Sequence, residues 1–94
     1  MAGHVNGPAP AFTEAIDWAS ASIAARGRLT VQGADLICGT AEALRRCGHH
    51  RITVDLREVV LADADALALL RALADDLRAR DSRLVVLSRE KEQP

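Results

Sequence analysis

Two aspartates, Asp63 and Asp65, interrupt an otherwise apolar run of alanine and leucine, "LADADALALL". A pair of carboxylates can act as a general acid and base or can bind a divalent cation. Such chemistry needs a partner, which would be a histidine, a further acid or a positioned lysine. His49 and His50 precede the strand-like segment "RITVDL", at its opposite end from Asp63. We therefore predict no catalytic residue, no metal site and a protein that is not an enzyme.

The other reactive residues form no familiar active-site motif. The sequence has no glycine-rich phosphate loop, no GxSxG elbow and no HExxH pair. Cys38 and Cys47 are too few for a disulfide framework and fit no zinc pattern, so we expect two reduced, partly buried thiols. Asp55 resembles the phosphoacceptor of a two-component receiver domain, but the acidic pair and the lysine of that domain are missing from the required places. We predict no cofactor.

A helix that begins near Asp63 explains both aspartates without any chemistry. At the N-cap, the Asp63 carboxylate can accept hydrogen bonds from free N–H groups of the first turn. Asp65 would then be the second helical residue, where negative charge meets the positive end of the helix dipole, an effect of ~0.3–1 kcal/mol.

The composition describes one ordinary globular domain. The chain has 94 residues, of which 49% are apolar and 27% are charged, and its formal net charge is −1. Acidic residues and arginines are interspersed, so we expect no nucleic-acid partner. No apolar run approaches the ~20 residues that span a bilayer, so we expect no membrane insertion. The opening "MAGHVNGPAPA" lacks the pattern of a secretory signal, and we expect a cytoplasmic protein.

The first quarter of the chain is ambiguous between helix and strand. Residues 1–11 contain prolines and glycines and are expected to form a flexible arm. In the next stretch a helical spacing of apolar residues ends at Gly27, a typical helix stop. The same stretch can also form strands, with Ile16 and Trp18 on one face and a turn near "ARG". The pattern alone slightly favours the helix.

The rest of the chain alternates strands and helices. We predict a strand over "RLTVQG" that ends at Gly33, a short helix with Thr40 as its N-cap, and a strand over "RITVDL". Leucines at helical spacing then predict a second helix, with Leu67, Leu70, Leu73 or Ala74, and Leu77 as its apolar stripe. The apolar "RLVVLS" predicts a final strand buried on both faces. This order indicates an α/β sheet with parallel strands.

The motifs "GADL … TAEALRR … ITVDLREVVLADADALALLRAL … RLVVL" resemble a STAS domain of the anti-sigma factor antagonist type. That family typically reads "GELD … TAPALRE … VVVDLSGVTFIDSSGLGALL … LRLV". The resemblance covers about two thirds of the chain, from Leu29 to Leu87. It implies a small mixed sheet of about four strands with helices packed mainly on one face, opened by a β-hairpin. The domain would span residues 12–88, followed by a polar tail over residues 89–94.

The resemblance also assigns a role to the two aspartates. In the family, a D-S-S-G motif begins a helix, and its second serine is phosphorylated by an anti-sigma factor that is also a kinase. The motif falls on Asp63, Ala64, Asp65 and Ala66, so Asp65 takes the place of the phosphoacceptor. Phosphoserine carries a charge of about −1.5 to −2. Asp65 is therefore a partial phosphomimetic, and the methyl of Ala66 would hinder the close approach of a kinase.

The resemblance implies a non-catalytic regulatory module that binds an anti-sigma factor, a kinase or a related regulator and is not switched by the usual phosphorylation. The implied binding residues are Asp63, Ala64, Asp65, Ala66, Leu67 and Leu69. The alternative is a STAS subunit that docks on a transporter ATPase or senses a small ligand or nucleotide. Family members continue into a last helix, whereas this sequence stops at Pro94, so we expect an apolar surface that a partner or a second copy covers.

Overall fold

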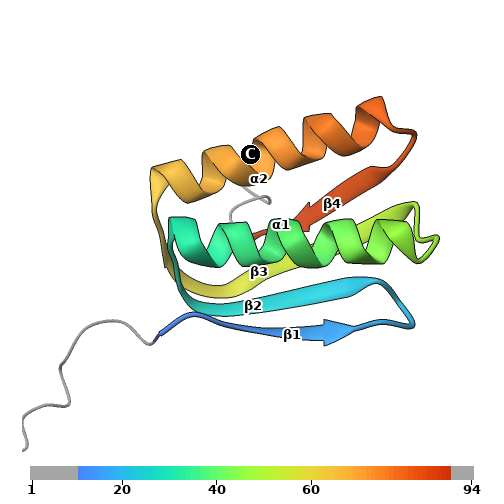
Figure 1. Ribbon diagram of the computed structural model, residues 1–94. Helices are drawn as coiled ribbons and strands as arrows, with labels where there is room; N and C mark the ends of the chain where they lie inside the picture. Colours follow the sequence, from blue (N-terminus) through green and yellow to red (C-terminus); the bar gives the residue numbers. More distant parts are fainter. Residues whose placement is uncertain (1–10, 90–94) are drawn as a thin grey trace, which may run out of the picture.

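A four-stranded mixed sheet with two helices on one face makes up the described part of the chain, residues 11–89 of a computed structural model (Figure 1). The elements are β1 (Thr13–Asp17), β2 (Ser22–Leu29), α1 (Val31–Arg46), β3 (Arg51–Ala62), α2 (Ala64–Ala79) and β4 (Arg83–Leu87). The strand order is β1-β2-β3-β4, with β1 antiparallel to β2 and the other pairs parallel. The expected α/β fold is therefore confirmed.

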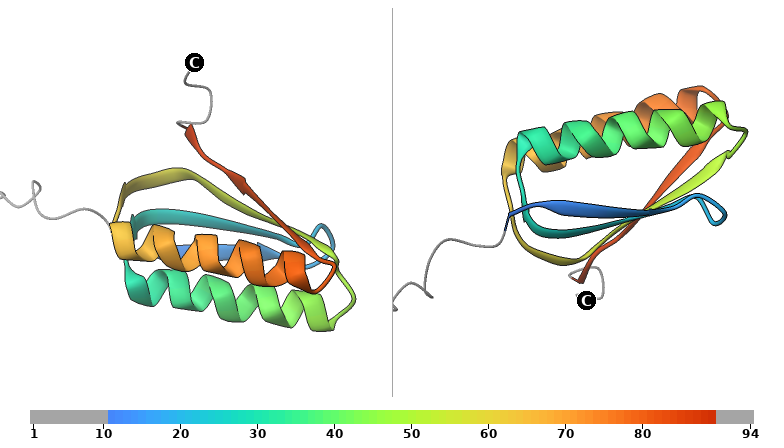
Figure 2. Two further views of the ribbon diagram at one scale, coloured as in Figure 1. Left: turned by 90° about the horizontal axis from the view of Figure 1, so that it is seen from above. Right: turned by 60° about the horizontal axis from the view of Figure 1, so that its bottom comes forward.

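The core lies between the sheet and the two helices, which run side by side over one face of the sheet (Figure 2). The predicted strand "RITVDL" is confirmed as the first half of β3. Its apolar residues Ile52, Val54 and Leu56 are buried under the helices, whereas Thr53 and Asp55 face the other way and are half-buried. This alternation follows from the two-residue period of a strand that is covered on one face.

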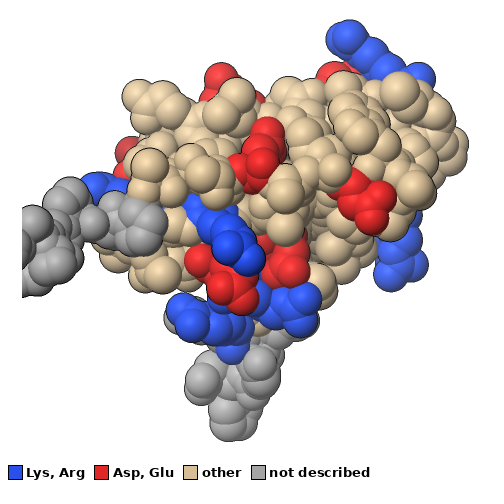
Figure 3. Space-filling view, turned by 90° about the horizontal axis from the view of Figure 1, so that it is seen from below, with Lys and Arg blue, Asp and Glu red and all other residues tan. Residues whose placement is uncertain are grey.

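The opposite face of the sheet is open among the described residues. Figure 3 shows arginines and acidic residues interleaved over part of this face, with an uncharged surface around them. One such pair joins Arg57 Nη2 to Asp55 Oδ2 at 2.9 Å. The Arg57 guanidinium, through its hydrogen bonds, holds the pKa of the Asp55 carboxyl below its usual value.

The N-terminal segment is a β-hairpin, so the slight preference of the pattern for a helix was wrong. Strand β1 pairs with β2 in antiparallel register, with Ile16 opposite Ile23. The turn between them is stabilised by Asp17, whose Oδ1 accepts hydrogen bonds from the backbone N–H groups of Ala19 and Ser20. Such Asx turns compete with helix formation, and sheet pairing with β3 then buries the inward-facing residues of β2.

Helix α1 begins ten residues earlier than predicted, because its N-cap is Thr30 rather than Thr40. Strand β2 ends at Leu29, and Thr30 is the N-cap, because its Oγ1 accepts a hydrogen bond from the N–H of Gly33 at 3.2 Å. Thr40 instead lies within the helix, where its hydroxyl donates to Glu14 Oε2 at 3.1 Å. Both threonines suit a helix start locally, so the choice between them depends on packing against the sheet.

The C-terminal half follows the predicted order with two corrections. In α2, Ala66, Leu70 and Leu77 are buried, whereas Leu67, which was predicted to belong to the buried apolar stripe, is 37% exposed. Strand β4 is an edge strand of the described sheet, and its apolar residues are only half-buried, so burial on both faces was wrong. Within residues 11–89, no helix is both long enough and apolar enough to cross a membrane. Residues 1–10 and 90–94, most of the predicted arm and tail, lie outside the described residues.

Candidate functional site

The junction between β3 and α2 positions the two aspartates at the carboxyl end of the parallel strands. Asp63 is the N-cap of α2, as predicted, with an extended backbone (φ −73°, ψ 143°). Its N–H donates to Leu29 O at 3.0 Å, and its carbonyl accepts from the N–H of Leu67 at 3.1 Å. Backbone hydrogen bonds therefore hold the start of α2 against the end of β2.

The Asp63 side chain does not make the predicted cap. It forms no hydrogen bond with the first turn of α2. Instead, Asp63 Oδ1 accepts from Arg28 Nη2 at 3.3 Å, in an ion pair whose side chains are 35% and 48% exposed. Because β2 and β3 are parallel and Leu29 pairs with Ala62, their carboxyl ends meet at one edge of the sheet. Arg28, 35 residues away in sequence, thus competes with the helix for the carboxylate.

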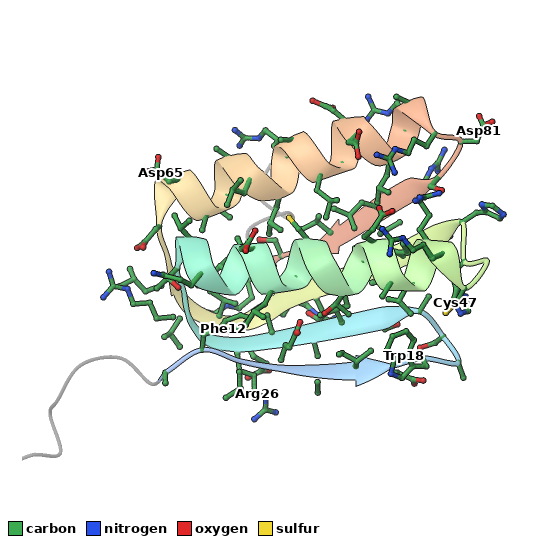
Figure 4. All side chains as sticks on the ribbon, viewed as in Figure 1. Phe12, Trp18, Arg26, Cys47, Asp65 and Asp81 are labelled. Carbon is green, nitrogen blue, oxygen red and sulfur yellow. The ribbon has the colours of Figure 1, made fainter. Side chains whose placement is uncertain are left out.

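Asp65 lies in the first turn of α2 and is exposed. Figure 4 shows its carboxylate at the corner of the fold, directed away from the body of the protein. Within the described chain, no ion pair or side-chain hydrogen bond involves Asp65. Its charge therefore acts on the helix dipole and on whatever approaches from solvent.

The six residues predicted for partner binding do not form one surface. Ala64 and Asp65 are exposed, and Leu67 and Asp63 are partly so. Ala66 is fully buried in the core, so its methyl lies beneath the surface rather than in the path of a partner. Leu69 is half-buried and packs against the core. Of the six residues, only the four that are at least partly exposed can contact a protein that docks on the start of α2: Asp63, Ala64, Asp65 and Leu67.

Apolar residues that the sequence analysis did not single out extend this surface. We call it the carboxyl-edge surface and define it by Arg28, Val31, Leu61, Asp63, Asp65 and Leu67. Val31 and Leu61 are 42% and 51% exposed, large values for apolar side chains. Val31 was taken for a strand residue. The exposure of Leu61 could have been predicted from the sequence, because the apolar doublet "VL" after the alternating part of β3 breaks the two-residue period of a strand buried on one face.

An apolar groove adjoins the carboxyl-edge surface along α2. The groove has a volume of about 260 Å³ and is lined by Leu56, Leu67, Leu70, Arg71, Ala74 and Val86. Leu67 belongs to both features, so the apolar surface continues from the start of α2 into the space between α2 and β4.

The described residues offer little for acid–base or metal chemistry at this edge. Asp63 is engaged with Arg28, and His49 and His50 lie at the far end of β3, as expected. Among residues 11–89, no group of three His, Cys, Asp or Glu side chains could hold a metal ion. Both cysteines are free; Cys38 is half-buried, as expected, whereas Cys47 is exposed. Burial, with a smaller effect of Asp35, raises the pKa of the Cys38 thiol.

No protein-family model matches the chain, and no curated protein sequence matches it significantly. The likeness to STAS domains therefore rests on the sequence motifs, and what it implies about function is a proposal.

Proposed function

We propose that the protein is a non-catalytic regulatory module that binds another protein through the carboxyl-edge surface. The observation that carries this proposal is the exposure of Val31, Leu61 and Leu67 around two carboxylates at the start of α2. Apolar side chains surrounded by charged residues are typical of protein-binding surfaces. The neighbouring groove along α2 enlarges the apolar area that a partner can bury.

The partner that fits this surface combines apolar side chains with a basic group or with amide donors. Asp65 is exposed and has no partner within the described chain, so its carboxylate can pair with such a group. Charged residues at the rim of an interface mainly favour the correct partner and speed up association. On the STAS resemblance, this partner is an anti-sigma factor, a kinase or a related regulator.

Asp65 makes this module different from a serine-switched antagonist. A carboxylate cannot accept a phosphoryl group from a serine kinase in the stable way that a hydroxyl does, and its negative charge needs no kinase. We therefore propose that binding is fixed in one state rather than switched by phosphorylation at this position. The variant Asp65→Ser would restore the hydroxyl without altering the buried residues around it.

Affinity capture from the native cell, followed by mass spectrometry, tests the proposal. We expect the wild-type chain to retain an anti-sigma factor, a kinase or a related regulator. The variants Leu61→Ser and Leu67→Ser should lose that protein. Leu36→Ser is the matched control, because Leu36 is 57% exposed on α1, outside the carboxyl-edge surface. Retention of no regulator, or equal retention by Leu61→Ser and Leu67→Ser, would contradict the proposal.

The groove along α2 favours a second candidate function, that of a subunit that docks on a transporter ATPase. A groove that is lined mainly by leucine, alanine and valine suits an apolar segment of a larger assembly. The capture experiment distinguishes the two candidates by the identity of the retained protein. In addition, Ala74→Ser should weaken ATPase docking more strongly than Leu61→Ser does.

A further inference from the structure

A polar pocket lies at the other end of the fold, where α2 ends and strands β3 and β4 begin. Its volume is about 470 Å³, and its polar lining residues are His50, Arg78, Asp81, Ser82 and Arg83. We propose that this pocket binds the phosphate group of a small soluble phosphate ester. The site is separate from the carboxyl-edge surface, and its occupancy does not depend on the protein-binding function proposed above.

Ser82 provides the first reason for a ligand. The residue is 6% exposed, and its Oγ is buried without any hydrogen-bond partner in the structure. Its backbone N–H donates to Leu77 O at 2.8 Å, so the position of the residue is held by the end of α2. Buried hydroxyl groups nearly always have a hydrogen-bond partner. A phosphate oxygen in the pocket would accept a hydrogen bond from this hydroxyl after a small adjustment of the side chain.

An excess of positive charge provides the second reason. Arg51 and Arg83 are direct neighbours across the β3–β4 pair. Of these two residues only Arg83 lines the pocket, together with Arg78, and among residues 11–89 neither Arg51 nor Arg83 forms an ion pair. Within the described chain, the ion pair of Arg78 Nη1 with Asp75 Oδ1, at 3.8 Å, is the only one that Arg78 forms, and both side chains are well exposed. A phosphate dianion in the pocket would pair with Arg78 and Arg83, because guanidinium groups bind phosphate oxygens through two hydrogen bonds at once.

Two features of the pocket oppose an anion, and the structure weakens both. The carboxylate of Asp81 lies at the tip of the turn after α2 and points away from the body of the fold (Figure 4). The carbonyl groups at the end of α2, which would repel an anion, already accept hydrogen bonds. Leu77 O accepts from the N–H groups of Arg80 and Ser82, and Arg78 O accepts from that of Asp81.

The size of the pocket favours an ester over the bare anion. Its volume of about 470 Å³ is in the range of small-molecule sites and exceeds what one phosphate group fills. Backbone pairing of Arg83 N with His50 O, at 2.7 Å, joins the two strand ends that form its wall. His50, the remaining polar lining residue apart from Asp81, can form hydrogen bonds with a hydroxylated organic group, as in a sugar phosphate.

NMR titration of the full ¹⁵N-labelled chain at low ionic strength tests this proposal with three probes: inorganic phosphate, glucose 6-phosphate and glucose. We expect saturable shifts of the amide signals of His50, Ser82 and Arg83 with both phosphates and none with glucose. Glucose 6-phosphate should bind more tightly than phosphate. Ser82→Ala and Arg83→Gln should each weaken its binding by about tenfold. Arg71→Gln is the matched control, because it also removes one positive charge, from a residue of α2 that does not line the pocket.

Three results would overturn the proposal. One is the lack of any saturable shift up to about 10 mM phosphate, the range of millimolar affinity. Another is an equal loss of binding in Arg71→Gln, which would indicate general attraction to a basic surface. The third is equal affinity for phosphate and glucose 6-phosphate, which would exclude the ester. Arg78→Gln replaces Arg83→Gln if the latter loses the dispersed spectrum of the folded protein.

Discussion

Replacing Ser82 with alanine should stabilise the ligand-free protein. The Ser82 hydroxyl is buried and has no hydrogen-bond partner among residues 11–89, so folding removes it from water without compensation. This loss costs about 1–3 kcal/mol. Alanine leaves in its place a void of roughly 10–15 Å³, about one water-sized probe. At about 24 cal/mol per Å³, the void costs about 0.3 kcal/mol. The net gain should be about 0.7–2.7 kcal/mol.

Equilibrium unfolding in urea measures this gain. A stabilisation of about 1 kcal/mol raises the urea midpoint by roughly 0.3–1 M, with an unchanged slope. Ser22→Ala is the control, because the half-buried Ser22 Oγ accepts a hydrogen bond from Ser20 Oγ at 2.9 Å. Loss of that bond should leave stability unchanged or reduce it by up to ~1 kcal/mol. A Ser82→Ala protein that is less stable than wild type by 1 kcal/mol or more would refute the reasoning, because the hydroxyl would then have a partner.

Phosphate should reduce the difference in unfolding free energy between Ser82→Ala and the wild-type protein. A ligand at ten times its dissociation constant stabilises the folded state by about 1.4 kcal/mol. Ser82→Ala should bind phosphate more weakly and should gain less from the same concentration. Unfolding measured without and with phosphate thus distinguishes the destabilisation caused by the unpaired hydroxyl from the contribution of the same hydroxyl to phosphate binding. A constant difference between the proteins at every phosphate concentration would show that the hydroxyl takes no part in binding.

Three further predictions concern the helices and the open face of the sheet. Gly39→Ala should raise the free energy of unfolding by up to ~1 kcal/mol, since its new methyl meets nothing within 4 Å. Gly33→Ala should raise the free energy of unfolding by less, because its new methyl would lie 3.0 Å from the ring of Phe12. Urea unfolding of both variants checks this difference. Asp65→Ala should cost no more than ~1 kcal/mol by the same assay, and a larger loss would show that Asp65 holds the helix. Because Arg57 lowers the pKa of Asp55, this pair should stabilise the fold above pH 3.8 and lose its effect as the pH falls through the lowered pKa. Asp55→Asn should weaken this acid dependence in unfolding curves measured between pH 2 and pH 5, and identical curves would contradict it.

Local patterns in the sequence were sufficient for the elements with a clear period. The alternation of Ile52, Val54 and Leu56 predicted β3, and leucines at helical spacing predicted α2. The N-cap position of Asp63 also followed from its neighbours. These features depend on residues that are close together in the chain, because burial of one face repeats every two residues in a strand and every three to four in a helix.

Where two local patterns fitted, packing made the choice. Residues 12–27 satisfied a helical and a strand period alike, and pairing of β2 with β3 decided for the hairpin. The sequence pattern placed Thr30 in a strand and the helix cap at Thr40, and only the course of β2 shows that Thr30 is the N-cap of α1. The exposure of β4 likewise depends on its position at the edge of the sheet, and this position cannot be predicted from the segment "RLVVLS" alone.

The sequence alone therefore determined that Asp63 and Asp65 stand at the start of a helix, whereas the tertiary structure decided what surrounds them. The ion pair of Asp63 with Arg28 joins residues 35 positions apart, because parallel strands bring their carboxyl ends to one edge. The burial of Ala66 and the exposure of Leu61 also depend on how the chain packs at that edge of the sheet. At the opposite end, the pocket beside Ser82 exists only because β3 and β4 begin next to each other. Contacts of this kind depend on strand register, which is a property of the whole sheet.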